Sequence, residues 1–232
     1  MKKSLRVVHT LWLREMLRFR RSTSQIIGSL AMPLLFLMVL GPAFSSSFLI
    51  PGLQLSYMEF LAPGIIGMTV LFPSMMGGVS IIWDREFGFL KEILISPSSR
   101  FFVALGKALG GVTAAMIQGI SIMVIAGIFG VKYTSWFGAI LSIPIMLIIG
   151  LGFIGLGIAF ASKIDSHEGF QMVMSFIMMP IFFLSGAMFP IDKIPAWLQF
   201  LAYLDPLTYG IDALRYVLTG YSILPPAVDL LV

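Results

Sequence analysis

The sequence has no cysteine and little charge, with 15 Lys and Arg and 11 Asp and Glu among 232 residues. The absence of cysteine excludes disulfides, thiol nucleophiles and cysteine-ligated metal or iron–sulfur centres. Charged residues make up 11% of the chain and hydrophobic residues 58%, whereas a soluble domain is about 25% charged. So few charges cannot cover the surface of a globule of this length, and the sequence therefore predicts a protein that faces lipid.

Signatures of catalysis and cofactor binding are also missing. No Gly-x-x-x-x-Gly-Lys-Ser/Thr phosphate loop occurs, so we expect any ATP hydrolysis to take place on another subunit. His9 and His167 have no ligand partner at helical spacing, which predicts that the chain has no metal site. Three aspartates are interpreted as caps, turn residues and a partner for Arg215 rather than as catalytic groups. They are Asp192, Asp205 and Asp212.

Glycines are abundant inside the apolar runs. Residues 150–155 match a dinucleotide-binding Gly-x-Gly-x-x-Gly pattern, but they lie in an uncharged run with no strand before them. We interpret these glycines, and the pairs at 77–78 and at positions 106 and 110, as places where two helix backbones approach closely.

Five runs without Asp, Glu, Lys or Arg are long enough to cross a membrane, which takes about 20 apolar residues. They are 22–58, 60–83, 108–131, 133–162 and 169–191. The first run is too long for one helix, and the prolines and serines in its second half place the first span at about 25–44. The sequence therefore predicts an all-α polytopic membrane protein with five transmembrane helices.

Basic residues are distributed unevenly about these spans. Twelve lie before the first span or in loops on the same side of the membrane, and three lie on the other side. Because Lys and Arg concentrate in cytoplasmic segments, we expect a cytoplasmic N-terminus in a multi-pass protein of the plasma or inner membrane.

The N-terminal segment 1–21 has the pattern of an amphipathic helix. Leu5, Val8, Trp12, Met16 and Phe19 recur at steps of three and four, and most basic residues lie off this stripe. A helix of this kind lies at the membrane interface, either as an anchor on anionic headgroups or as a moving gate element.

A second amphipathic segment occupies the loop 84–97 between the second and third spans. Trp83, Phe87, Leu90 and Leu94 share one helical face, and Pro97 ends the helix. This surplus apolar surface lies either in the membrane interface or in the groove of a protein partner.

Two further features concern the outer side and the interior. Segments 194–204 and 206–218 are too short or too interrupted by charge to span, so we expect a re-entrant or interfacial helical pair. Thr113 and Gln118 are polar positions within the third span. They line an adaptable substrate path or form hydrogen bonds between helices.

Three stretches, taken in order, resemble the membrane subunits of type-2 ABC exporters, and the drug-exporter branch most of all. The first is the basic amphipathic N-terminus. The second is YMEFLAPG (57–64) leading to WDREFGFLKEILISP (83–97), and the third is LSGAMFP (184–190) continuing to PAW (195–197) and DPLTYGIDALR (205–215). Together they cover nearly the whole chain.

The resemblance implies partners and roles for particular residues. It implies a separate ABC ATPase subunit that binds ATP and Mg²⁺, a second permease copy, contact with membrane lipids and no nucleic acid. The cytoplasmic loop would be the coupling helix on the ATPase, formed by Asp84, Arg85, Glu86, Phe87, Leu90, Lys91 and Glu92. The extracellular gate region would hold Pro190, Trp197, Pro206 and Arg215.

The resemblance also implies six spans, of which the sequence supplies five. The stretch 216–232 is too short and too interrupted by proline for a sixth helix, so we expect a shortened chain. The chain reads as one permease domain, 1–232. Its interfacial helix is 1–21, its five spans lie in 22–191, and its extracellular region and C-terminal remnant are 192–232.

The function expected from these features is ATP-driven export of drug-like or lipid-like amphiphilic cargo from the cell. The chain itself is expected to perform no covalent chemistry and to carry no catalytic residue. The alternative is an ATP-independent membrane channel or scaffold protein, while a lipid-modifying enzyme is disfavoured because no catalytic constellation is present.

Overall fold

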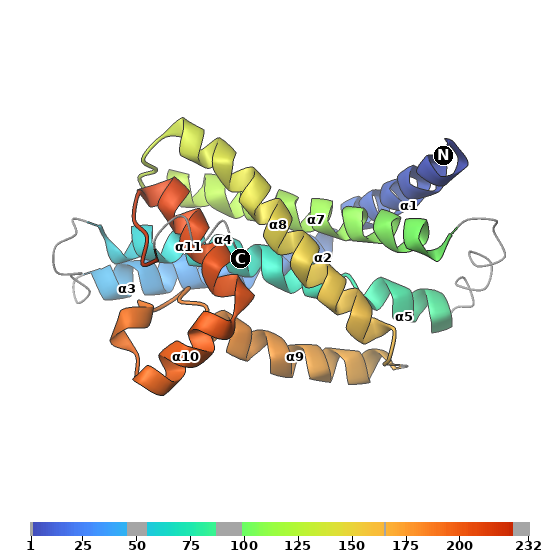
Figure 1. Ribbon diagram of the computed structural model, residues 1–232. Helices are drawn as coiled ribbons and strands as arrows, with labels where there is room; N and C mark the ends of the chain where they lie inside the picture. The colour runs from blue at the N-terminus through green and yellow to red at the C-terminus, as the bar shows by residue number, and fades with distance from the viewer. Residues whose placement is uncertain (1, 46–54, 87–98, 165, 225–232) are drawn as a thin grey trace.

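A computed structural model describes residues 2–45, 55–86, 99–164 and 166–224, and every regular element in these ranges is helical. The elements are α1 (Lys2–Arg21), α2 (Thr23–Leu35), η1 (Phe36–Leu40), α3 (Gly41–Ser45), α4 (Tyr57–Met76), α5 (Val79–Glu86), α7 (Arg100–Ile128), α8 (Trp136–Ala161), α9 (His167–Leu184), η2 (Ile191–Lys193), α10 (Ala196–Leu204) and α11 (Pro206–Thr219). Figure 1 shows α1 and α5 at one end of the bundle, here called the basic end, and α3, α10 and α11 at the other.

Five helical segments are long and apolar enough to cross a membrane, which confirms the predicted class of all-α polytopic protein. They are Ile26–Phe44, Tyr57–Arg85, Phe101–Ile128, Trp136–Ala161 and His167–Leu184. The first continues through α2, η1 and α3, close to the predicted span 25–44.

Two predicted span boundaries are wrong, each for a local reason. The helix of the third span begins at Arg100 rather than near position 108, because Lys107 is neutralised by a buried ion pair with Asp84. The fifth span ends at Leu184 rather than near position 191, because Gly186 turns the chain with a left-handed φ of 69°.

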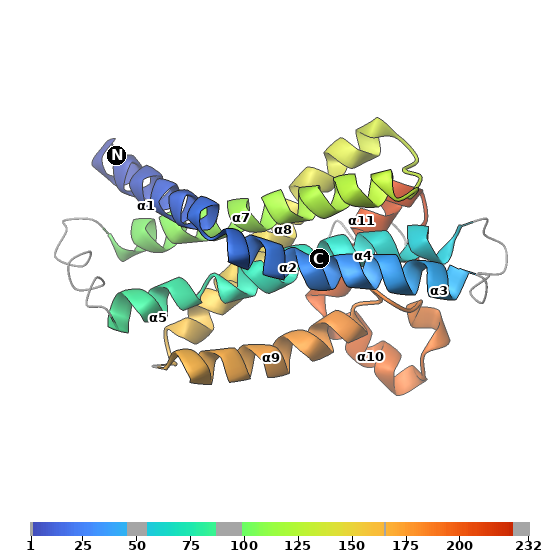
Figure 2. The ribbon, with the colours of Figure 1, turned by 180° about the vertical axis from the view of Figure 1, so that it is seen from behind.

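The second span forms the centre of the bundle. Helix α4 contacts α2, α7, α8, α9 and α11, and most of its residues are buried, whereas fewer than half of the residues in each other span are buried. Figure 2 shows α2 running alongside α4. A capping box begins α4, in which Ser56 Oγ accepts from the Glu59 backbone N–H and the Glu59 carboxylate accepts from the Ser56 backbone N–H.

Glycines allow close contacts between helices, as predicted for Gly78, Gly106 and Gly110. A Cβ on Gly78 would lie 2.3 Å from the Gly157 carbonyl oxygen, which locks the α4–α5 junction against α8. Gly106 and Gly110 face α1 in the same manner. Within 150–155 the interpretation is wrong for two positions, because nothing lies within 4 Å of a Cβ built at 152 or 155.

Helix α1 packs along the first half of α7. The predicted apolar stripe is only partly the buried one, since Leu5 is 62% exposed and Leu11, which lies off the stripe, is buried. The close approach at Gly106, whose added Cβ would meet Leu11 Cβ at 2.9 Å, decides which face of α1 turns inward.

The segment after the fifth span forms the predicted pair of short helices, α10 and α11. The Asp205 carboxylate caps α11 by accepting from the Leu207 backbone N–H at 2.9 Å, and Gly220 ends the helix in the left-handed conformation. The stretch 225–232, part of the predicted C-terminal remnant, lies outside the described residues.

Candidate functional site

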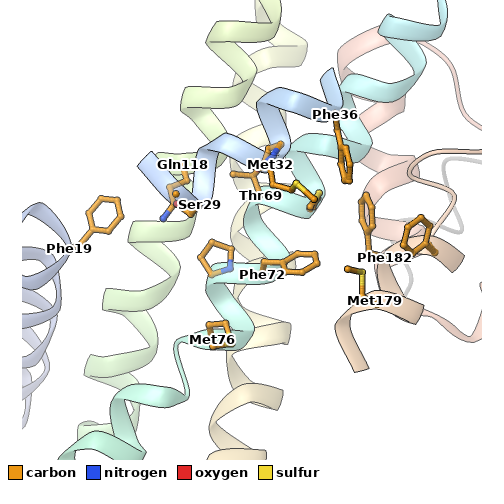
Figure 3. Close-up of a pocket in the computed structure, with 15 residues that line it drawn as sticks. Phe19, Ser29, Met32, Phe36, Thr69, Phe72, Met76, Gln118, Met179 and Phe182 are labelled. Atoms are coloured by element: carbon orange, nitrogen blue, oxygen red, sulfur yellow. The ribbon is translucent and has the colours of Figure 1, made fainter. Parts of the chain in front are cut away.

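A cavity of about 360 Å³ lies between the first, second and fifth spans, with one wall from α7. Its lining is dominated by phenylalanine and methionine: Phe19, Gly28, Ser29, Met32, Pro33, Phe36, Met68, Thr69, Phe72, Pro73, Met76, Gln118, Met179, Phe182 and Phe183. Figure 3 shows Phe36, Phe72 and Phe182 pointing into the space between these helices. No charged side chain is among the described residues that line it.

The polar groups of this cavity are largely satisfied by the protein. Ser29 Oγ lies 2.7 Å from Gln118 Oε1 and donates to it, and Thr69 Oγ1 donates to the Ile65 carbonyl at 2.7 Å. Within the described ranges, the Gln118 amide nitrogen has no protein acceptor. The cavity therefore offers a ligand one amide donor on an otherwise apolar wall.

The two predicted path residues lie in different places. Gln118 lines the cavity, but Thr113 does not, because its hydroxyl accepts from Trp12 Nε1 at 3.1 Å and donates to the Leu109 carbonyl. Thr113 thus holds α1 against α7, which was the alternative that the sequence left open.

Asp84, the first residue of the predicted coupling segment, is directed into the protein. Its side chain is 5% exposed and pairs with Arg14 Nη2 at 2.5 Å and with the Lys107 ammonium. Lys107 also donates to the Ser80 carbonyl at 3.0 Å. This cluster joins α1, α5 and α7 at the basic end.

Arg85 connects α5 to the end of the fourth span. Its guanidinium donates to the Ala161 carbonyl at 3.2 Å and to the Ile164 carbonyl at 3.4 Å, groups that the end of α8 leaves without helical partners. Helix α5 ends at Glu86. The remaining coupling residues Phe87, Leu90, Lys91 and Glu92 lie outside the described residues.

The predicted gate residues differ in their exposure. Trp197 on α10 is 66% exposed, whereas Arg215 on α11 is 1% exposed. Pro206 is the first residue of α11, and Pro190 precedes η2. Arg215 and Trp197 therefore occupy different environments, one inside the bundle and one on its surface.

Arg215 is held by acceptors from three segments. It donates to the Gly186 carbonyl at 2.8 Å, lies 3.4 Å from Asp212 Oδ1, and stands 4.1 Å above the Phe60 ring. Burial lowers the pKa of the guanidinium, and Asp212 opposes that shift. The predicted pair of Asp212 with Arg215 is confirmed within α11, while the contacts of Arg215 with the Phe60 carbonyl and ring fasten α11 to α4.

Asp205 has a feature that the sequence did not reveal. Its Oδ2 atom is buried without a hydrogen-bond partner in the described part of the chain. Burial raises the pKa of the carboxyl to about 7, while the bond from the Leu207 backbone N–H acts in the opposite direction. The Asp-Pro pattern predicts a cap, but only the packing of α10 and α11 removes the second oxygen from water.

Comparison with known proteins relates the chain to membrane transport proteins. The chain matches the ABC-2 type transporter family over residues 6–219. It is 30% identical to the putative transport permease ycf38 of Cyanophora paradoxa over 211 residues, which cover 90% of this chain and 73% of that protein.

Two other relatives are named for different roles. Nodulation protein J of Rhizobium leguminosarum bv. trifolii is 27% identical over 215 residues, covering 91% of this chain and 81% of that protein. The probable multidrug ABC transporter permease YbhR of Escherichia coli (strain K12) is 27% identical over 165 residues, covering 71% of this chain and 45% of that protein.

Proposed function

The chain belongs to the ABC-2 type transporter family, and from that membership we propose that it is the membrane-spanning subunit of an ATP-driven exporter. ATP and Mg²⁺ bind to a separate ATPase subunit, and this chain forms the path through the cell membrane. The basic end of the bundle faces the cytoplasm, because Lys and Arg concentrate there.

The observation that carries the transport role is the apolar cavity between the first, second and fifth spans. Methionine side chains are flexible and polarizable, and phenylalanines provide large contact surfaces with little directional demand. A lining of Met32, Met76, Phe72 and Phe182 with a single free amide therefore suits cargo with a substantial apolar part.

A second copy of the chain would enclose this cavity. The spans on either side of it leave apolar side chains on the surface of the single chain, including Ile27 and Leu35 on α2 and Met172 and Phe176 on α9. Covering this surface with its own copy buries both sets of side chains and closes the cavity between two subunits.

The coupling role belongs to α5 and the segment after it. ATP binding closes the ATPase subunits, which displaces the segment that follows Glu86. The contacts of Asp84 with α1 and α7, and of Arg85 with the end of α8, transmit this displacement to the spans around the cavity. The spans then open the cavity to the outside.

Coexpression with the ATPase encoded nearest to the gene tests this proposal. The double variant Glu86→Ala, Phe87→Ala should lose most of the copurified ATPase and most transport, with unchanged insertion into the membrane. The control variant Glu168→Ala removes an exposed carboxylate at the same end of the bundle and should retain both.

The outcomes separate the proposed function from its alternative. Unchanged copurification in the double variant would remove the coupling role from this segment. A wild-type chain that retains no ATPase yet conducts cargo would instead favour an ATP-independent channel.

A further inference from the structure

A second cavity, of about 230 Å³, adjoins the apolar cavity on the side of the basic end, between α1, α4, α5, α7 and α9. Four residues line both cavities: Phe19, Pro73, Met76 and Gln118. Because these side chains line both spaces, small rotations of flexible ones such as Met76 would let an elongated ligand occupy both.

The second cavity has charged walls, and one of its cations is free of ion pairs. Lys107 is engaged by Asp84 and by the Ser80 carbonyl. Arg18 lies with its guanidinium 4.0 Å above the Trp83 ring and has no carboxylate within ion-pair distance among the residues described. Burial lowers the pKa of Arg18, and Glu15 opposes the shift. An arginine nevertheless stays protonated.

A buried donor without an acceptor lies on the opposite wall. The His167 ring packs against the Trp83 ring with centroids 5.4 Å apart, and its Nε2 atom lies 3.0 Å from the Gln171 amide nitrogen. When the Gln171 amide nitrogen donates to Nε2, the neutral imidazole carries its proton on Nδ1. This Nδ1 is buried and has no hydrogen-bond partner in the described residues. A rotation of the imidazole toward the cavity would let a ligand oxygen accept from it.

The charged cavity and the apolar cavity follow each other along the spans in the same order as the headgroup and tail of a lipid. Trp83 and His167 stand at the ends of the second and fifth spans, and Arg18 precedes the first span. The ends of transmembrane helices lie near the lipid headgroups. The apolar cavity lies deeper, beside Met32 and Phe72 within the spans. A charged space at the interface followed by an apolar space in the membrane matches the two parts of an amphiphile.

We propose that the two cavities form one binding site for an amphiphile with an anionic headgroup. Arg18 and His167 bind the phosphate or carboxylate oxygens of the headgroup, and the apolar cavity binds the tail. Glu15 lines the same space and lowers its net positive charge. The role of the ligand as cargo rests on the proposed function, but its binding does not.

Three amphiphiles that share a twelve-carbon tail test the headgroup preference. The purified full chain in phosphatidylcholine nanodiscs is titrated with dodecyl phosphate, dodecyl maltoside or dodecyltrimethylammonium. Tryptophan fluorescence is followed, because Trp83 forms the floor beneath Arg18. We expect dodecyl phosphate to bind most tightly. Arg18→Gln should weaken its binding about tenfold, as loss of one charge-assisted contact does.

Matched variants decide whether the effect is local. Arg20→Gln removes the same charge from an exposed position of α1 and should change the affinity less than twofold, while Arg18→Lys should retain most of it. Equal effects of Arg18→Gln and Arg20→Gln, or equal affinities for the three headgroups, would overturn the proposal.

Two further measurements distinguish the source of the ligand. A copurified anionic phospholipid that dodecyl phosphate displaces identifies a membrane lipid as the occupant. ATP-dependent removal of dodecyl phosphate from vesicles that contain the chain and its ATPase identifies cargo. Both results support the site. Headgroup-selective binding without any ATPase partner would contradict the proposed function alone.

Discussion

At the scale of single residues, Asp205 combines two roles that oppose each other as the pH changes. Its carboxylate caps α11, yet its second oxygen is buried without a partner. The pKa is raised to about 7 in the folded protein, whereas an unfolded aspartate titrates near 3.9. The folded state therefore binds the proton more tightly between these two values.

The stability of the protein should therefore depend on pH. The free energy of unfolding falls as the pH rises from about 4 to about 7, and it changes no further above that range. The total loss is at most about 4 kcal/mol, since one pKa unit corresponds to about 1.4 kcal/mol.

Asp205→Asn should abolish this dependence, because asparagine keeps an oxygen for the cap and carries no charge. We expect the variant to match the wild type in unfolding temperature below about pH 4 and to exceed it increasingly from there to pH 8. Asp192→Asn, at an exposed carboxylate nearby in the sequence, serves as the control. Parallel unfolding curves of wild type and Asp205→Asn across this range would show that Asp205 is not the titrating group.

At the scale of helices, the contact of α1 with α7 depends on the absence of side chains at two glycines. A Cβ on Gly110 would approach Glu15 Cβ to 2.6 Å, which leaves no space for a methyl group. Overpacking of this kind costs about 1–3 kcal/mol. Arg14 and Trp12 reach their partners only when α1 lies in this position, so overpacking at Gly110 would weaken the whole contact between α1 and α7.

Gly110→Val should therefore loosen α1 from the bundle. We expect amide hydrogen exchange in α1 to accelerate about fivefold to a hundredfold, as the cost of overpacking implies. Gly152→Val places the same side chain in a span where a Cβ meets nothing within 4 Å, so exchange in α1 should be unchanged there. Slow exchange of α1 in both variants would mean that α1 adapts without leaving α7.

The helices and their order were predictable from the sequence, because Asp, Glu, Lys and Arg interrupt the apolar runs near each membrane boundary. Lys107 is an exception, because it lies within α7 rather than at a membrane boundary. Its charge is compensated by Asp84, which lies 23 positions earlier in the chain. Which face of α1 turns inward, and which polar side chain lines the cavity, were not predictable. Both depend on contacts between distant segments, such as Ser29 with Gln118.

At the scale of the whole molecule, most surface within the spans is apolar, and composition alone does not separate lipid-facing from partner-facing helices. The second span is enclosed, while the first and fifth leave the cavity between them with little cover from the chain itself. Helix α8 also exposes large side chains, among them Ile148 at 70%. The position of the cavity distinguishes these surfaces, because in the proposed dimer the second copy would close it only from the side of α2 and α9.

Single-cysteine variants test this arrangement without background, since the chain has no cysteine of its own. Phe176→Cys on α9 and Ile27→Cys on α2 should give covalent dimers with a short bismaleimide in membranes that also contain the ATPase. Both positions are strongly exposed in the single chain, at 82% and 64%. Ile148→Cys on α8 should stay monomeric, because lipid covers that face in a two-fold dimer. Dimers formed preferentially through Ile148→Cys would place the interface on α8, and the cavity would then open to lipid rather than to a second subunit.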